Sequence, residues 1–448
     1  MTLSAVTEAL RQEELARFVS ANPKSAAHAA ARARHWHEGV PFHWMRDWPS
    51  PFPLVVDEAR GAQLKTVDGQ MLDDFCLGDT AAMFGHSPPP VAAAIGRQAA
   101  IGFSTMLPTV DVEPVGALLS ERFGLSFWQV TTTASEANRA VIRWCREMTG
   151  RRKVLVFNGC YHGAVDDVFV DLRDGVPETR RSLVGQVNDL TATTTAIEFN
   201  DRAALDAALS AGDIACVLAE PVMTNVGMVL PQPGFLEYLR DVTTRAGTLL
   251  VWDETHTVSS GWGGHSATYG PPGDMLVIGK SIGGGVPCAV YGFSAEVARR
   301  MTAARGALPP GHSGIGTTLS ANALAIAAMR AMLEQVMTKH AYAHMIGHAA
   351  ELVNGLSAVI TSHNLPWHVS NVGARVELVF AAVPPRNGSE ARQAMDHERE
   401  ALLHLMLVNR GILLAPFHNM MLVSPETSSD QIARLVETIT ECVIRMNA

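Results

Sequence analysis

The stretch DMLVIGKSIGGG, residues 274–285, places Lys280 after a short apolar run and before a run of glycines. Lysine is normally a surface residue, because burying its ammonium group without a partner is costly. The apolar run in front of it is typical of a strand that is buried on both faces of a sheet. A lysine at the end of such a strand therefore needs a specific reason.

Apolar runs of this kind alternate with helical patterns between about residue 90 and residue 330. They read KVLVFNG, IACVLAEPV, GTLLVWDET, MLVIGK and CAVYGFS. Continuous apolar runs of this length indicate strands in a largely parallel sheet that is covered on both faces by helices. The sequence therefore predicts an α/β fold with a large central domain.

The two ends of the chain carry different patterns. Residues 52–76 suggest a small meander, in which Asp68 and Gly69 form a hairpin turn signal. The last helical pattern has a core-facing apolar stripe, made by Ile432, Leu435, Val436 and Ile439. We expect a smaller α+β domain built from both ends of the chain. The predicted divisions are an N-terminal arm and part of the small domain at 1–85, the large domain at 86–339, and the rest of the small domain at 340–448.

Composition excludes several classes of function. The 448 residues are 47% apolar and carry a formal net charge of -9, with no basic cluster for nucleic acid. The first residues, MTLSAVTEALRQEELARF, lack the basic and apolar regions of a signal peptide, and no apolar run is long enough to cross a bilayer. The six cysteines are scattered and the 17 histidines form no recognised ligand pattern. We therefore expect a cytoplasmic protein without metal.

Polar residues follow several of the apolar runs. The helix that begins in TTTASEAN has Thr133, Ala134 and Ser135 at its start, where free N–H groups can bind an anion; an ordinary helix cap is the simpler interpretation of these residues alone. Asp253 ends a buried strand, which is where open α/β sheets place ligands, and a buried carboxylate there requires a cationic partner. Lys280 ends the next apolar strand.

The tripeptide GKS at residues 279–281 invites comparison with a phosphate-binding P-loop. The upstream Gly273 is one position too far for the G-x-x-x-x-G-K-[ST] pattern, and the residues between form a strand where that motif needs a turn. ATP binding at this site is therefore disfavoured.

Together these motifs resemble one enzyme family. The order of the TTTASEAN helix start, YHG at 161–163, DE at 253–254 and GKSIGGG at 279–285 is similar to that of the class III (omega) aminotransferases, pyridoxal 5'-phosphate (PLP) enzymes of fold type I. The resemblance extends over most of the chain. Within the family it is similar to the branch of glutamate-1-semialdehyde aminomutases and beta-phenylalanine and D-phenylglycine aminotransferases. It implies a large domain with a mostly parallel seven-stranded sheet.

The resemblance implies a role for each of these residues. Lys280 would form a Schiff base with PLP and then move a proton between the substrate and the cofactor. Asp253 would pair with the pyridine nitrogen. The other residues that the resemblance places around the cofactor are Thr133, Ala134 and Ser135 at the phosphate, Tyr161 on the ring, His162 in the pocket, Glu220 near the cofactor, and Thr318 at the phosphate of a neighbouring subunit. A homodimer with shared active sites follows from this resemblance.

The chain departs from the family where substrate recognition is expected. The family commonly has valine after the acid pair, whereas this chain has Thr255, and many relatives carry an arginine where this chain has Ser260. Alignment with the beta-phenylalanine aminotransferases places Trp44 and His418 where those enzymes have carboxylate-binding arginines, with Arg46 close to the first. The segment PFHWMRDW, residues 41–48, is either a substrate-facing loop or an apolar lid at a dimer interface.

Three functions are compatible with these residues. The first is transfer of an amino group between an amino acid or amine, possibly bulky or aromatic, and a keto acid. The second is an isomerase, either an aminomutase of the semialdehyde type or an amino-acid racemase, which uses the same lysine without net transfer. The third is a cofactor-binding protein that has lost catalysis. Retention of Lys280 and Asp253 counts against the third, and the aromatic segment 41–48 favours the first over the second.

Overall fold

The computed structural model describes residues 5–447, which divide into two compact units. The larger unit contains Pro89–Tyr342 and the short segment Pro384–Gln393. The smaller unit contains the chain before Pro89, the segment Ala343–Val383, and the chain from Ala394 onward. The sequence-based division did not include the return of residues 384–393 to the larger unit, because this short segment has no apolar strand pattern.

The larger unit is built on a seven-stranded sheet with the strand order β4-β12-β11-β10-β9-β5-β8. The strands in that order are Phe127–Thr131, Ala289–Phe293, Met275–Ile278, Leu249–Asp253, Ile214–Ala219, Lys153–Phe157 and Thr194–Ile197. The reversed strand is β12, which pairs antiparallel with both of its neighbours, β11 and β4. The other strand pairs of this sheet are parallel. The predicted α/β fold with a mostly parallel seven-stranded sheet is confirmed.

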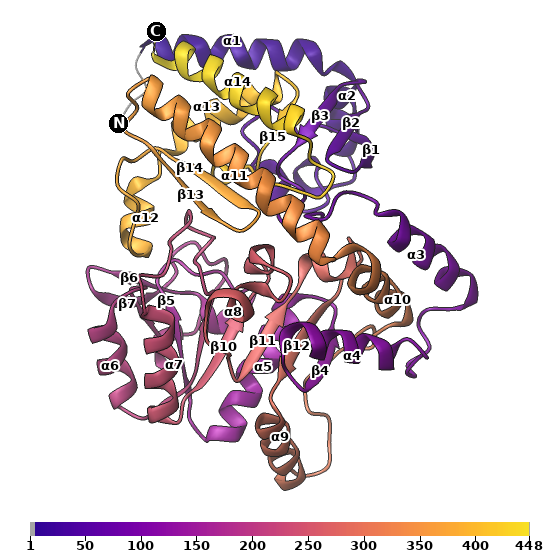
Figure 1. The fold of residues 1–448 in the computed structure, drawn as a ribbon, viewed down its shortest axis with the longest axis vertical. Helices are drawn as coiled ribbons and strands as arrows, with labels where there is room; N and C mark the ends of the chain where they lie inside the picture. Colours follow the sequence, from indigo (N-terminus) through magenta and orange to yellow (C-terminus); the bar gives the residue numbers. More distant parts are fainter. Residues whose placement is uncertain (1–4, 448) are drawn as a thin grey trace. The chain divides into compact units, whose positions relative to one another are not determined.

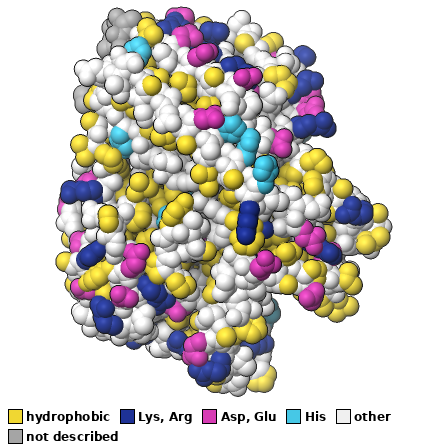
Figure 2. Space-filling model, in the orientation of Figure 1, with side chains coloured by type: hydrophobic (Ala, Val, Ile, Leu, Met, Phe, Trp, Pro, Cys, Tyr) yellow, Lys and Arg dark blue, Asp and Glu magenta, His cyan; other side chains and the backbone are white. Residues whose placement is uncertain are grey.

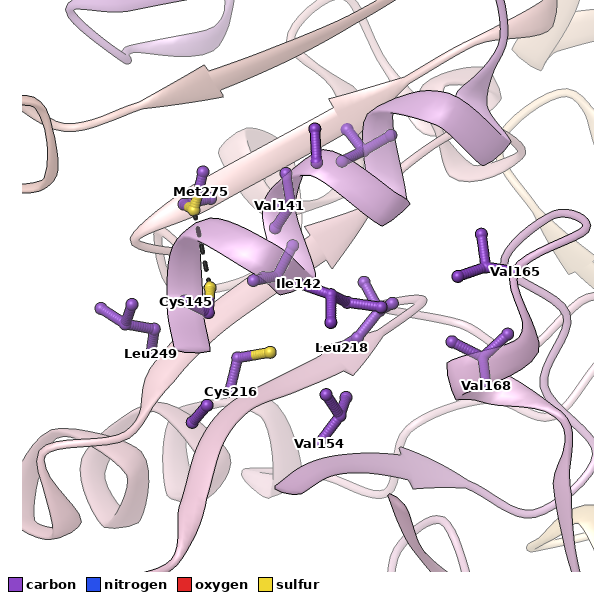
Figure 3. Close-up of a cluster of buried hydrophobic side chains, with 14 of the residues drawn as sticks. Val141, Ile142, Cys145, Val154, Val165, Val168, Cys216, Leu218, Leu249 and Met275 are labelled. Atoms are coloured by element: carbon purple, nitrogen blue, oxygen red, sulfur yellow. Dashed lines mark hydrogen bonds between the residues drawn. The ribbon is translucent and has the colours of Figure 1, made fainter. Parts of the chain in front are cut away.

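Helices cover both faces of this sheet (Figure 1). Alternate residues of a strand point to opposite faces, and on β5 Val154 and Val156 pack in the cluster with α5 (Ala134–Thr149). Phe157, on the other face, lies edge-on to Phe235 of α7 (Phe235–Ala246) at 6.0 Å. Figure 3 shows the core between α5 and the sheet, where the Cys145 and Met275 sulfurs lie 3.8 Å apart. The apolar runs are thus buried on both faces, as their composition predicts.

The remaining elements of the larger unit are mostly connecting helices. They are α3 (Pro89–Ile101), α4 (Val112–Phe123), α6 (Arg202–Ser210), α8 (Gly264–Tyr269), α9 (Ala295–Ala307), α10 (Ala323–Ala331), α12 (Gly388–Ala394) and a hairpin of β6 (Val170–Arg173) and β7 (Val176–Thr179). On α5, Ala137 and Val141 form part of an apolar stripe and are fully buried. Thr133 is the cap of this helix, because its hydroxyl accepts the N–H of Glu136 at 3.2 Å.

The smaller unit contains two small sheets. One has the order β1-β2-β3-β15 and the other β13-β14-β16. These strands are Val56–Arg60, Gln63–Thr66, Met71–Asp74, Ile412–Leu413, His368–Val372, Arg375–Val379 and Met420–Leu422. Its helices are α1 (Ala5–Ala21), α2 (Pro23–Arg32), α11 (Lys339–Ser362, from Ala343 onward), α13 (His397–Val408) and α14 (Ser429–Asn447). The predicted meander is present, and the Asp68-Gly69 turn joins β2 to β3.

The core of the smaller unit includes the last helix. Ile432, Leu435 and Ile439 of α14 are buried, and Val436 packs against the same cluster.

On the face drawn in Figure 2, Lys and Arg side chains lie interspersed with Asp and Glu side chains. Within residues 5–447, no helix is both long enough and apolar enough to cross a membrane.

Candidate active site

The adjacent strands β10 and β11 bring Asp253 and Lys280 to the same edge of the sheet. The two strands are parallel, and Asp253 lies in register with Val277, just before Lys280 in the chain. Because parallel strands end at a common edge, the two polar residues that the sequence singled out both lie at the carboxyl end of the sheet. Glu254 does not point to this edge, since its carboxylate accepts the backbone N–H groups of His265 and Ser266.

Lys280 has an unusual backbone conformation. Its φ angle is +49°, in the left-handed region that residues with a side chain rarely adopt, and it opens the short helix Lys280–Gly283. The preceding Gly279 allows a close approach to α5, because a Cβ on Gly279 would lie 2.8 Å from the Cβ of Ala134. Backbone strain of this kind costs free energy and tends to be kept at functional sites.

Asp253 is buried at the centre of a hydrogen-bonded group. Its carboxylate accepts from His162 Nδ1 at 2.9 Å, from Asn138 Nδ2 at 2.8 Å and from the N–H of Thr255 at 3.1 Å. Burial would raise the pKa of Asp253, but the hydrogen bond and charge of His162 outweigh it and lower the pKa. Burial would likewise lower the pKa of His162, but Cys160 and Asp253 together raise it to about 10. Asp253 and His162 therefore form a buried ion pair.

The start of α5 is arranged to receive negative charge. The Glu136 carboxylate accepts the backbone N–H of Thr132 at 2.9 Å and its hydroxyl at 2.6 Å. Ser135 Oγ accepts the N–H of Ala164 at 2.9 Å. The loop can approach Ser135 because residue 163 is glycine: a Cβ there would lie 2.3 Å from Ser135 Oγ. In these contacts the Thr133 and Ser135 hydroxyls act as acceptors, so each keeps a proton that it can donate to an anionic group such as a phosphate at the helix start.

Lys280 also begins a chain of hydrogen-bonded polar side chains, which is separate from the group around Asp253. Lys280 Nζ lies 2.5 Å from His256 Nε2, and His256 Nδ1 lies 2.6 Å from Thr224 Oγ1. The Thr224 hydroxyl in turn contacts the Glu220 carboxylate, whose other oxygen accepts from Asn225 Nδ2 at 2.8 Å. Glu220, which the family resemblance placed near the cofactor, is therefore connected to Lys280 through two side chains.

Two other predicted residues of the larger unit are exposed. Tyr161 is 46% exposed, and its ring lies 6.3 Å from that of Phe169, so its ring is accessible next to the buried His162. Thr318 is exposed in a turn. Two residues later, the Ser320 hydroxyl donates to the Glu136 carboxylate at 3.1 Å. Contact of Thr318 with a neighbouring subunit concerns a second chain and stays a prediction.

The three predicted substrate residues all lie in the smaller unit. Trp44 is 42% exposed, and the Arg46 guanidinium lies 3.5 Å from the Glu38 carboxylate. The side chain of His418 is 11% exposed, and its Nδ1 lies 2.8 Å from Glu377. Burial would lower the pKa of His418, but the charge of Glu377 raises it. Arg46 is thus the more accessible of the two cationic candidates.

Several buried polar atoms around Asp253 and Lys280 have no hydrogen-bond partner among the described residues. They are Asn138 Oδ1, His162 Nε2, Thr255 Oγ1 and Ser281 Oγ. Buried polar groups in native proteins are almost always paired, so these atoms indicate a site completed by a polar ligand. A buried carboxylate, a lysine at the sheet edge and an anion-receptive helix start fit PLP, which carries a ring nitrogen, an aldehyde and a phosphate.

Sequence reasoning missed three residues that the structure brings into the site. Asn138 was hidden by the apolar stripe of its helix, although a buried amide beside Ala137 and Val141 was a usable signal. His256 directly follows Thr255, the position where the chain departs from the family's valine, and no role was predicted for the histidine. Thr224 offered no signal, because threonine is common in loops and its contact with Glu220 depends on the fold.

Comparison with known proteins identifies the family. A family model described as aminotransferase class-III matches residues 45–443. The chain belongs to this family. The resemblance inferred from the sequence is therefore confirmed, including its branch, and so is the dependence of the family on PLP.

The relatives with known names point to two kinds of reaction. A glutamate-1-semialdehyde-aminomutase structure from Pseudomonas aeruginosa PAO1 is 47% identical, with a TM-score of 0.97 and 100% of both chains covered. A lysine-to-alanine variant of that enzyme was solved in complex with PMP. Glutamate-1-semialdehyde 2,1-aminomutase 2 of Brevibacillus brevis is 32% identical over 86% of this chain and 90% of its own. A beta-phenylalanine aminotransferase structure from Variovorax paradoxus is 28% identical, with a TM-score of 0.86 and 97% of both chains covered.

Proposed function

We propose that this protein is a PLP-dependent isomerase of the aminomutase type, which moves an amino group within one substrate molecule. The observation that carries the proposal is the full-length similarity to the Pseudomonas aeruginosa structure, at 47% identity. The sequence alone favours transamination, because of the aromatic segment 41–48, with the isomerase as the alternative. The relatives favour the isomerase.

The residues at the edge of the sheet would hold PLP in a fixed orientation. Asp253 would face the pyridine nitrogen, with its position held by His162 and Asn138. Thr133 to Ser135 at the start of α5 would bind the phosphate, and Tyr161 would cover the ring. When bound, PLP supplies an electron-withdrawing ring that stabilises negative charge on the carbon that carries the amino group.

Lys280 would serve two purposes in this reaction. Its amine would be the covalent attachment point of the cofactor, and once released it would take the proton from the substrate carbon that carries the amino group and later return it. An aminomutase performs this exchange at two carbons of one molecule, so it needs no separate amino acceptor.

Transamination is the second candidate. The similarity to the beta-phenylalanine aminotransferase and the exposed Trp44 and Arg46 favour it, because an indole ring and a guanidinium suit an aromatic amino acid. It would require a keto acid as a separate amino acceptor. A shared-site homodimer, with Thr318 reaching the partner's phosphate, belongs to both proposals and is tested by light scattering of the holoenzyme.

One experiment separates the two reactions. The holoenzyme is incubated with glutamate 1-semialdehyde and, in parallel, with beta-phenylalanine, each with and without a keto acid. The isomerase proposal expects turnover of the semialdehyde to its amino-shifted isomer with no keto acid present. Turnover of either substrate only when a keto acid is added, with a new amino acid formed from it, would overturn the isomerase proposal in favour of transamination.

A further inference from the structure

The polar chain that begins at Lys280 ends at a buried carboxylate. It runs from Lys280 through His256 and Thr224 to Glu220, with heavy-atom distances of 2.5 Å and 2.6 Å in its first two contacts. His256, Thr224 and Glu220 are all buried, with at most 6% of each residue exposed. Every contact joins groups that can donate or accept a proton, so the chain is continuous from the amine to the carboxylate.

With a neutral His256, the chemistry of these groups allows two proton arrangements. If Glu220 is ionised, it can only accept, so Thr224 donates to it and must accept from His256 Nδ1–H. His256 Nε2 then presents a lone pair to Lys280. If Glu220 carries a proton, it donates to Thr224, and Thr224 donates to His256 Nδ1. His256 Nε2–H then donates to the lone pair of the Lys280 amine. The two arrangements differ by the transfer of one proton from Lys280 to Glu220.

We propose that His256, Thr224 and Glu220 form a proton relay that accepts a proton from the Lys280 ammonium group and later returns it. In the forward direction Lys280 gives a proton to His256 Nε2, His256 Nδ1 gives its proton to Thr224 Oγ1, and the Thr224 hydroxyl proton passes to Glu220. One proton leaves the amine, one reaches the carboxylate, and His256 and Thr224 end neutral. This inference rests on Lys280 being the reactive amine of the proposed function.

The surroundings of Glu220 suit a proton acceptor that is used reversibly. Burial raises the pKa of Glu220, and this effect exceeds the opposing influence of the His162 charge and of the hydrogen bonds from Thr224 and Asn225, while the negative charge of Asp253 raises the pKa further. A raised pKa makes the neutral acid more accessible than it is for a glutamate in water. Asn225 holds the second carboxylate oxygen at 2.8 Å and fixes the direction of the acid toward Thr224.

The first test removes one hydroxyl from the middle of the relay. In the cofactor-free, full-length protein, Lys280 is modified with acetic anhydride at pH 7, and peptide mass spectrometry compares it with the exposed Lys65 of the same molecule. Thr224→Val should slow the relative modification of Lys280 roughly tenfold, because the amine loses its route to a proton acceptor. Thr224→Ser keeps the hydroxyl and should stay within about twofold of wild type.

Glu220→Gln is the second variant, which keeps the shape of the acid but removes its ability to take a proton. It should slow the modification of Lys280 as Thr224→Val does. If circular dichroism shows that Thr224→Val does not fold, Glu220→Gln takes its place as the test variant. Unchanged modification of Lys280 in Glu220→Gln, or an equal rate in Thr224→Val and Thr224→Ser, would overturn the relay.

The second test uses the holoenzyme and counts moving protons. The turnover rate of wild type and of Thr224→Ser should fall along a curve as the fraction of D2O increases, because several protons move together, whereas Thr224→Val should give a straight line. Straight lines for all three proteins would contradict the relay. Should the holoenzyme turn over none of the proposed substrates while the modification rates still differ as expected, the proposed function is wrong and the relay stands.

Discussion

The residues around Lys280 and those around Arg46 are built in opposite ways. Asp253 is buried and receives three hydrogen bonds, two of them from side chains, and Lys280 lies beside a buried histidine. Arg46 lies on a short helix, His43–Arg46, with a side chain that is 52% exposed, and its guanidinium lies 3.5 Å from the Glu38 carboxylate. The first region is rigidly held, and the second is open to solvent.

The difference separates two demands on the enzyme. Cofactor chemistry needs groups held at fixed distances in a dry environment, because charge is stabilised best by preorganised partners. Substrate choice needs groups that can reach different molecules, and exposed side chains on a connecting segment are suited to it. We therefore expect substitutions in the buried region to remove the reaction and substitutions near Arg46 to change which substrates are used.

The largest effect is expected for Lys280→Ala. Loss of the amine removes both the attachment point and the proton acceptor, so turnover should fall by about 10³-fold or more. Steady-state rates of the purified variant check this expectation. Lys65→Ala, which removes an exposed lysine 3.7 Å from Asp57, is the matched control and should keep full activity. Substantial turnover by Lys280→Ala would remove the distinction between the two regions.

Asp253→Asn should have the next largest effect. The amide cannot balance a positive ring nitrogen, so kcat should fall by about 10²-fold while cofactor is retained by the remaining contacts. Cofactor content is measured by absorbance beside the kinetics. The exposed Asp174→Asn is the control. Near wild-type kcat in Asp253→Asn would show that the buried carboxylate does not act on the cofactor.

His162→Asn tests the buried ion pair through stability. The pKa of His162 is raised to about 10, above its ordinary 6.5, so the stabilisation by the charged form is complete below about pH 6.5 and is lost as the pH rises toward 10. The pKa of Asp253 is lowered, so its contribution persists above its ordinary 3.8 and is lost at more acidic pH. The variant should lose about 3 kcal/mol of unfolding free energy at pH 6, and the loss should shrink between pH 7 and pH 10.

Urea unfolding at several pH values measures this difference. His363→Asn, at an exposed position, is the control and should change little at any pH. A loss of stability in His162→Asn that is the same at pH 6 and pH 10 would show that His162 is held by packing and not by its charge.

The smallest effect is expected at Arg46. If the guanidinium binds a substrate carboxylate, Arg46→Ala should weaken kcat/KM for an amino acid about tenfold and leave the matching decarboxylated amine nearly unchanged. Arg34→Ala, another exposed arginine near the same segment, is the control. Equal losses for both substrates would indicate a structural segment, and attention would turn to His418.

The fold could be predicted because its signals are local. Each strand of the central sheet that the sequence identified is a continuous apolar run, and the residues Asp253 and Lys280 directly follow two of them. Their meeting at one edge follows from parallel pairing alone. The cap formed by Thr133 and the turn at Asp68-Gly69 are likewise set by neighbouring residues.

The rest of the site depends on contacts between distant parts of the chain. Asn138 and Asp253 are 115 residues apart, and His256 meets Thr224 across 32 residues. No local pattern distinguishes these polar residues from ordinary core or loop residues. The return of residues 384–393 to the larger unit is of the same kind, since Ser389 contacts Asn158 across the intervening chain.

The central claim is that Lys280 holds the cofactor, and borohydride reduction of the holoenzyme tests it most directly. Reduction makes the bond between PLP and its lysine permanent, and peptide mass spectrometry then identifies the modified residue. The chain offers five lysines, at positions 24, 65, 153, 280 and 339. The account predicts that the cofactor mass is found on the peptide that contains Lys280 and not on the other four. Stoichiometric labelling of any other lysine would contradict it.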